Sequence, residues 1–187
     1  MSGSAKSEVT SPKSKVQSPE SRPARPVVVV SKCLLGERCR YNGEPISAPA
    51  VLSLSNRVEF MPVCPETGIS LPIPRDPIRL IKADSAIRLI QTRTGADLTA
   101  KMHSFCRRFL SGLKVEGFIL KARSPSCAVR DAAVYDDSGE VTGETRPGLF
   151  AAEAISRFPG LPIEDEERLK ESSVRLRFVG RLRRIRT

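Results

Sequence analysis

Long apolar runs are missing from this chain of 187 residues. No stretch approaches the ~20 apolar residues that a helix needs to cross a bilayer. The first residues also lack the basic start and apolar core of a secretory signal. We therefore expect a soluble, cytoplasmic protein with no membrane partner.

Histidine and paired cysteines are also scarce. The one histidine, His103, falls on the polar side of a predicted helix, where we expect it to be solvated. None of the five cysteines forms the C-x2-C pair that is common in structural zinc sites. An odd number of cysteines in a chain of this size argues against a disulfide framework and favours free thiols or metal ligands.

Positive charge is abundant, with a formal net charge of +10, but most of it lies near the two ends of the chain. Six arginines fall between Arg175 and Arg186, and three more net positive charges lie in residues 1–25. A solvated basic helix explains the arginines, but so does contact with RNA or docking of another domain. The composition leaves these three interpretations open.

Three regions follow from composition. Residues 1–25 are rich in Ser, Pro and charge and offer little to bury, so we predict a disordered tail. Residues 26–170 alternate strand and helix patterns and form the predicted globular domain, and residues 171–187 form a basic C-terminal segment.

The apolar pattern predicts an α/β domain with three layers, similar to a Rossmann domain, around a mostly parallel sheet. Its clearest helix begins near Leu98, with Asp97 as the expected N-cap, because apolar residues then recur every three or four positions. Other helices are expected at 49–56, around 148–158 and from Ile163 onward. Strands are expected at 26–30, 58–63, 86–92, 116–122 and 131–137.

Three cysteines each follow a predicted strand: Cys33, Cys64 and Cys127. Loops after parallel strands meet at one edge of a sheet, where ligands bind, so we expect the three thiols to form one site. Zinc and an iron-sulfur cluster are the two candidates for such a site. A [4Fe-4S] cluster held by only three cysteines would keep one iron free to act as a Lewis acid, which suits catalysis.

The other two cysteines are interpreted differently. Cys106 lies within the apolar stripe of its helix and is expected in the core. Cys39 lies between turns and is a fourth ligand, a sulfur-accepting thiol or simply part of a turn.

Polar residues gather near the same loops. Glu66 is a candidate general acid or base, or else an N-cap or ion-pair partner. Ser124 and Ser126 are placed to hydrogen-bond a ligand or their own turn, and Lys121 and Arg123 bring positive charge that favours thiolates. Arg75 is placed to clamp an anionic or carbonyl group, or to pair with Asp76.

The motifs KCLLG with RYNG, VCPE with PIPRDPIRL, GFILKARSPSCAV and GLFA occur in this order. Together they resemble the thiouracil desulfidase family, long catalogued as a domain of unknown function. The resemblance runs from about Val27 to about Leu169. It is nearest to the form often fused to a second, C-terminal domain, which we do not expect within these 187 residues.

The resemblance implies a [4Fe-4S] cluster held by Cys33, Cys64 and Cys127. It also implies removal of sulfur from a thiolated pyrimidine such as 2-thiouracil, with water replacing the sulfur and sulfide leaving. Glu66 would supply acid or base help, and Ser124 and Ser126 would position the ligand. Two departures affect substrate identity: PETGISLP stands where many relatives have Gly-Gly, and Ala128 stands where glycine is frequent. An alanine would strain the backbone if that position needed a positive φ.

Two function classes follow. The first is an iron-sulfur-dependent desulfidase that releases sulfide from a thiolated base, free or within RNA. The second is a basic nucleic-acid or partner-binding module whose cysteines hold structural zinc or nothing. The sequence does not specify the oligomeric state.

Overall fold

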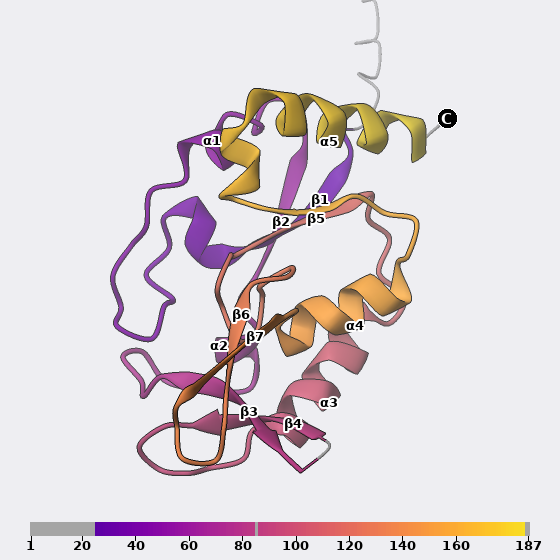
Figure 1. Cartoon of the computed structure of the whole chain (residues 1–187). Coiled ribbons are helices and arrows are strands. Elements are labelled where there is room, and N and C mark those ends of the chain that lie inside the picture. The colour runs from indigo at the N-terminus through magenta and orange to yellow at the C-terminus, as the bar shows by residue number, and fades with distance from the viewer. Residues whose placement is uncertain (1–24, 85, 186–187) are drawn as a thin grey trace, which may run out of the picture.

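The computed structural model describes residues 25–84 and 86–185 and contains two four-stranded sheets (Figure 1). The predicted tail at 1–25 lies, apart from its last residue, outside the described part. One sheet is entirely parallel and has the strand order β2-β1-β5-β8. Its strands are β1 (Val27–Ser31), β2 (Glu59–Val63), β5 (Gly117–Leu120) and β8 (Ile163–Asp165).

Strand β1 is central because its side chains are apolar on both faces. Val28 and Val30 pack into one apolar cluster, and Val29 packs into the other on the opposite face. All three are fully buried. This is the burial expected of a parallel strand covered by helices on both sides.

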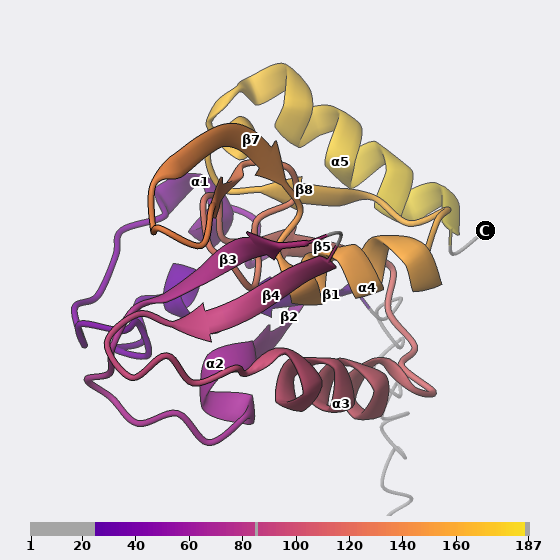
Figure 2. The same cartoon turned by 60° about the horizontal axis from the view of Figure 1, so that its bottom comes forward.

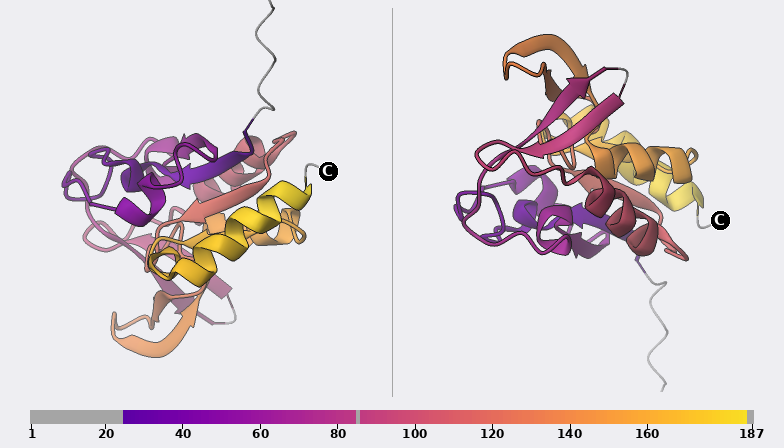
Figure 3. Two further views of the ribbon diagram at one scale, coloured as in Figure 1. Left: turned by 90° about the horizontal axis from the view of Figure 1, so that it is seen from above. Right: turned by 90° about the horizontal axis from the view of Figure 1, so that it is seen from below.

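Helices cover both faces of the parallel sheet, which confirms the predicted three-layer α/β fold. Helices α1 (Pro49–Leu52) and α5 (Ser172–Ile185) lie over one face (Figure 1 and the left view of Figure 3). Helices α3 (Thr99–Leu110) and α4 (Leu149–Arg157) lie over the other (right view of Figure 3). The apolar side of α5, including Phe178 and Leu182, is part of the core.

A second sheet has the order β4-β3-β6-β7 and flanks the first (Figure 2). Two of the predicted strands, β4 (Ala86–Gln91) and β6 (Ala132–Tyr135), lie here and not in the parallel sheet. Their hairpin partners β3 (Ile78–Ala83) and β7 (Val141–Arg146) were not predicted.

Two details of the predicted secondary structure are wrong. The segment from Ile163 begins as strand β8, which pairs with β5, and passes through a 3-10 turn, η2 (Arg168–Lys170), before α5 starts at Ser172. The N-cap of α3 is Leu98, not Asp97. The Asp97 carboxylate instead accepts the backbone N–H of Thr99 at 2.9 Å, one residue inside the helix.

In the described ranges, no helix combines the length and apolar character needed to cross a membrane.

Candidate active site

A cavity of about 300 Å³ opens at the carboxyl edge of the parallel sheet, where three strand ends contribute to its wall. The thiols Cys33, Cys39, Cys64 and Cys127 all line it, together with Glu66 and Ser124. Ser126 lies behind the wall, fully buried. The structure thus brings the predicted site residues together and adds Cys39 to them.

A tight turn after β1 places Cys33 and Cys39 in the same cavity. The 3-10 turn η1 (Lys32–Leu35) ends at Gly36, whose φ of 85° and N–H bond to the Cys33 carbonyl reverse the chain. Positive φ is inexpensive for glycine. Both cysteines are buried, with 9% and 5% exposure. Hydrogen bonding with the Cys33 thiol, together with burial, raises the pKa of Cys39 to about 11.

Cys64 directly precedes the short helix α2 (Pro65–Gly68) at the end of β2. Its thiol donates to the Cys39 carbonyl at 3.7 Å, and its own carbonyl accepts the N–H of Gly68. The hydrogen bond with the Cys39 thiol and burial raise the pKa of Cys64. The Cys39 thiol therefore lies within hydrogen-bonding reach of both the Cys33 thiol and the Cys64 thiol.

Cys127 sits in a loop that its own serines shape. The Ser124 hydroxyl accepts the N–H groups of Ser126 (3.2 Å) and Cys127 (3.1 Å). Burial raises the pKa of the Cys127 thiol. Ala128 is not among the described residues with positive φ, so its replacement of a glycine carries no backbone strain here. The strained residue is Arg123, at φ 61°.

The GLFA motif, residues 148–151 at the start of α4, is hydrogen-bonded to this loop. The N–H of Leu149 donates to the Pro125 carbonyl (3.1 Å), and that of Phe150 donates to the Ser126 carbonyl (2.9 Å). A Cβ on Gly148 would lie 2.5 Å from the Ser126 carbonyl carbon, so only glycine permits this approach. The start of α4 therefore fixes the cysteine loop.

Arg75 forms a buried ion pair with Glu66, which was expected to act as an acid or base or else as an N-cap or ion-pair partner. The alternative expectation for Arg75, a pair with Asp76, is wrong. The Arg75 Nε and Nη2 atoms lie 2.9 and 2.5 Å from Glu66 Oε2, and Nη2 also donates to the Cys39 carbonyl. The two side chains are 1% and 15% exposed. Glu66 Oε1 accepts the hydroxyl of Ser126 at 3.3 Å. Asp76 pairs instead with Arg93.

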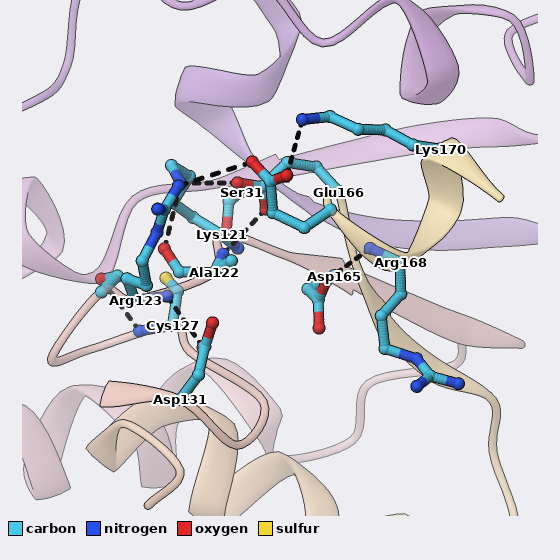
Figure 4. Close-up of polar contacts among 12 residues, drawn as sticks. Ser31, Lys121, Ala122, Arg123, Cys127, Asp131, Asp165, Glu166, Arg168 and Lys170 are labelled. Atoms are coloured by element: carbon cyan, nitrogen blue, oxygen red, sulfur yellow. Dashed lines mark hydrogen bonds and ion pairs between the residues drawn. The ribbon is translucent and has the colours of Figure 1, made fainter. Parts of the chain in front are cut away.

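The sequence did not indicate Glu166, which β8 delivers to the same sheet edge (Figure 4). Its Oε1 atom accepts from Lys121 Nζ at 2.5 Å, and its Oε2 atom accepts the N–H of Ala122 at 2.7 Å. Lys121 lines the thiol cavity. The segment had been predicted as a helix, so the acidic residue after a strand went unrecognised.

Two residues lie outside the site. Cys106 is fully buried in the core, as predicted, and burial raises its pKa to about 12. His103 is only partly exposed, and its Nδ1 atom lies 2.9 Å from Glu153 Oε1, so it is paired and not simply solvated.

The donors that line the cavity are the kind that hold an iron-sulfur cluster. No three His, Cys, Asp or Glu side chains of residues 25–84 and 86–185 are arranged to hold one metal ion. Thiols from three loops line one cavity of about 300 Å³, and cysteine thiolates are the ligands of iron-sulfur clusters.

Fold and cavity define the class: an α/β protein with a thiol-lined site at the carboxyl edge of a parallel sheet. The model of the 2-thiouracil desulfurase family matches residues 28–166, and the chain belongs to that family. This confirms the resemblance seen in the motifs.

Two relatives illustrate the match. The chain is 27% identical over 153 residues to the uncharacterized protein YbbK of Bacillus subtilis (strain 168), covering 78% of this chain and 99% of that one. A solved structure of the [4Fe-4S]-dependent thiouracil desulfidase TudS superposes with a TM-score of 0.59 at 26% identity. It covers 82% of this chain and 98% of that one.

Proposed function

We propose that this protein is an iron-sulfur-dependent desulfidase that removes the sulfur of a thiolated pyrimidine, such as 2-thiouracil, and releases sulfide. Family membership and the likeness to a thiouracil desulfidase support the reaction class. The observation that carries the proposal is that Cys33, Cys64 and Cys127, from three separate strand ends, line one cavity.

Cys33, Cys64 and Cys127 are the proposed cluster ligands. When bound, a [4Fe-4S] cluster with three protein thiolates supplies one iron that is free to bind the substrate's sulfur as a soft Lewis acid. The proposed substrate, a flat ring, would enter the same cavity that these three cysteines line. Its wall contributes Glu66 and the Ser124 loop on the side of Cys127.

Glu66 is the proposed general base for the attacking water. Arg75 holds its Oε2 atom through two N–H donors, which fixes the orientation of the carboxylate. The Oε1 atom does not contact Arg75; it accepts a hydrogen bond from the Ser126 hydroxyl, and Glu66 lines the cavity. In the proposed hydrolytic reaction, a C=S group and water give a C=O group, hydrosulfide and a proton.

The decisive experiment is anaerobic reconstitution with iron and sulfide, followed by an iron count and visible absorbance. We expect about four irons per wild-type chain. We expect each of Cys33→Ala, Cys64→Ala and Cys127→Ala to lose the cluster. Cys106→Ala is the matched control, since that thiol lies in the core. Sulfide release from 2-thiouracil should follow iron content, and iron uptake that ignores the three cysteines would refute the proposal.

A second candidate, contact with RNA, is supported by the exposed arginines Arg177, Arg181 and Arg183 on α5. Clustered arginines neutralise phosphates and release counterions, so such binding would weaken steeply with salt. The test is RNA binding at two salt concentrations with wild type and an Arg177→Glu/Arg181→Glu variant. Equal binding by both proteins would remove this candidate.

A further inference from the structure

Lys121 extends from the end of β5 into the wall between two cavities. One is the thiol cavity, and the other, which we call the side cavity, measures about 250 Å³. Charged residues on the wall of the side cavity are Arg40, Lys121, Arg123, Glu166, Glu167 and Lys170, beside a mostly apolar stretch at 46–50. Lys121 thus lines both the proposed reaction space and a second cavity beside it that carries charged groups.

One N–H donor of the Lys121 ammonium has no hydrogen-bond acceptor among the described residues. An ammonium carries three N–H donors. Two are used, by Glu166 Oε1 at 2.5 Å and by the Ala122 carbonyl at 3.0 Å. In the part of the chain that the structure describes, the third meets no protein acceptor. The side chain is only 18% exposed, so this donor is available to a group inside the thiol cavity.

Glu166 connects Lys121 to the side cavity. Both carboxylate oxygens of Glu166 accept hydrogen bonds (Figure 4). The Glu166 side chain is 7% exposed. Burying an ion pair costs desolvation that its attraction often fails to repay, so stability alone is a poor reason for this pair. The other charged side chains close to this ion pair have partners of their own, since Glu167 pairs with both Arg123 and Lys170.

We propose that Lys121 is a catalytic residue that protonates the departing sulfide, and that Glu166 returns a proton to it from the side cavity. This inference rests on the proposed desulfidase function and adds an acid to the base, Glu66. Acid and base then lie in one cavity but belong to separate ion pairs, with Glu166 and Arg75 respectively.

The proton count closes with these two groups. Water supplies its oxygen to the ring carbon and loses both protons, which leave through Glu66. The C–S bond breaks with its electron pair on sulfur, and Lys121 gives that sulfur one proton. Hydrosulfide leaves, and the Lys121 amine regains its proton from solvent through Glu166. The sum is C=S + H2O → C=O + HS⁻ + H⁺, with no change in oxidation state.

The test separates the charge of Lys121 from its proton. Lys121→Arg keeps a positive charge but cannot give up its proton, because the pKa of arginine lies above about 12. With wild-type iron content, we expect kcat to fall about 100-fold or more, the usual loss for a missing acid, while KM changes little. Lys114→Arg, on the exposed connection before β5, is the matched control.

Chemical rescue supplies a second readout that a structural role would not move. In Lys121→Ala, added propylamine should restore part of kcat, and Glu166→Gln should slow turnover without responding to the amine. A Lys121→Arg enzyme within about threefold of wild type, or a Lys121→Ala enzyme that no amine restores, overturns the proposal. If wild type holds its cluster but releases no sulfide from any thiolated base, the desulfidase function itself fails.

Discussion

Replacing Gly148 with alanine should disrupt the cysteine loop, although alanine can adopt the backbone conformation of residue 148. Gly148 has φ −64° and ψ 160°, which any residue adopts. The obstacle is contact: the new Cβ would lie 2.5 to 2.7 Å from backbone atoms of Ser126 and Pro125. Backbone atoms cannot rotate away as a flexible side chain can, so the loop or α4 must move.

The cost can be worked out from those contacts. Overpacking typically costs 1–3 kcal/mol, and each weakened N–H bond from the start of α4 to the loop adds about 1 kcal/mol. We expect a total of about 3 kcal/mol, or a fall in Tm of about 6–12 °C for a domain of this size. Because Cys127 belongs to the displaced loop, iron uptake should fall as well.

Gly160→Ala is the matched control, because a Cβ there meets nothing within 4 Å and the residue has no positive φ. It should leave Tm unchanged or raise it slightly, since alanine lowers the entropy of the unfolded chain. Thermal unfolding and iron counts on both variants decide the matter. Equal Tm values for the two would show that α4 does not brace the cysteine loop.

Three further predictions concern single interactions. Arg75→Met should lower the free energy of unfolding, measured in urea, by about 3–5 kcal/mol because it leaves the Glu66 carboxylate without its ion-pair partner. Adding Glu66→Gln should recover part of that loss, and strictly additive effects would contradict the ion pair. Hydrogen bonds from the hydroxyl and N–H of Thr99 lower the pKa of the Asp97 carboxyl below 3.8. The ionised carboxylate therefore stabilises the folded protein above pH 3.8. This stabilisation is lost as the pH falls through the lowered pKa of the folded state. Asp97→Asn should therefore be about 0.5 kcal/mol less stable than wild type at pH 7 and equal to it near pH 2, and a constant difference would refute this. Cys106, with its pKa raised to about 12, should resist iodoacetamide at pH 8 until the protein unfolds, as mass spectrometry of the labelled chain would reveal.

The sequence predicts the strand ends well because buried parallel strands appear as continuous apolar runs. The run at 26–30 and the run before Lys121 stop abruptly at polar, cysteine-bearing turns. That boundary is a local signal, and the rule that parallel strands share an edge turns it into a prediction of one site. The placement of Cys33, Cys64 and Cys127 follows from these two steps.

Contacts that depend on how the chain folds back on itself leave no local signal in the sequence. Arg75 has an acid directly beside it in the sequence, yet it pairs with Glu66, nine residues earlier, because the loop folds back over α2. Strand β8 has only three residues and shows no alternation that a pattern could reveal. Glu166 was missed for the same reason, since its place at the sheet edge depends on pairing with β5.

The strand order β2-β1-β5-β8 also constrains how the protein is made. Val28 pairs with Gly117, and β5 pairs in turn with residues 163–165, so the sheet closes through contacts between distant parts of the chain. Such long-range pairing is slow compared with helix formation. During synthesis, Cys33 and Cys64 emerge long before Cys127, and a nascent chain that stops short of Cys127 presents only part of the proposed ligand set. Insertion of the proposed cluster would therefore come only after Cys127 has left the ribosome.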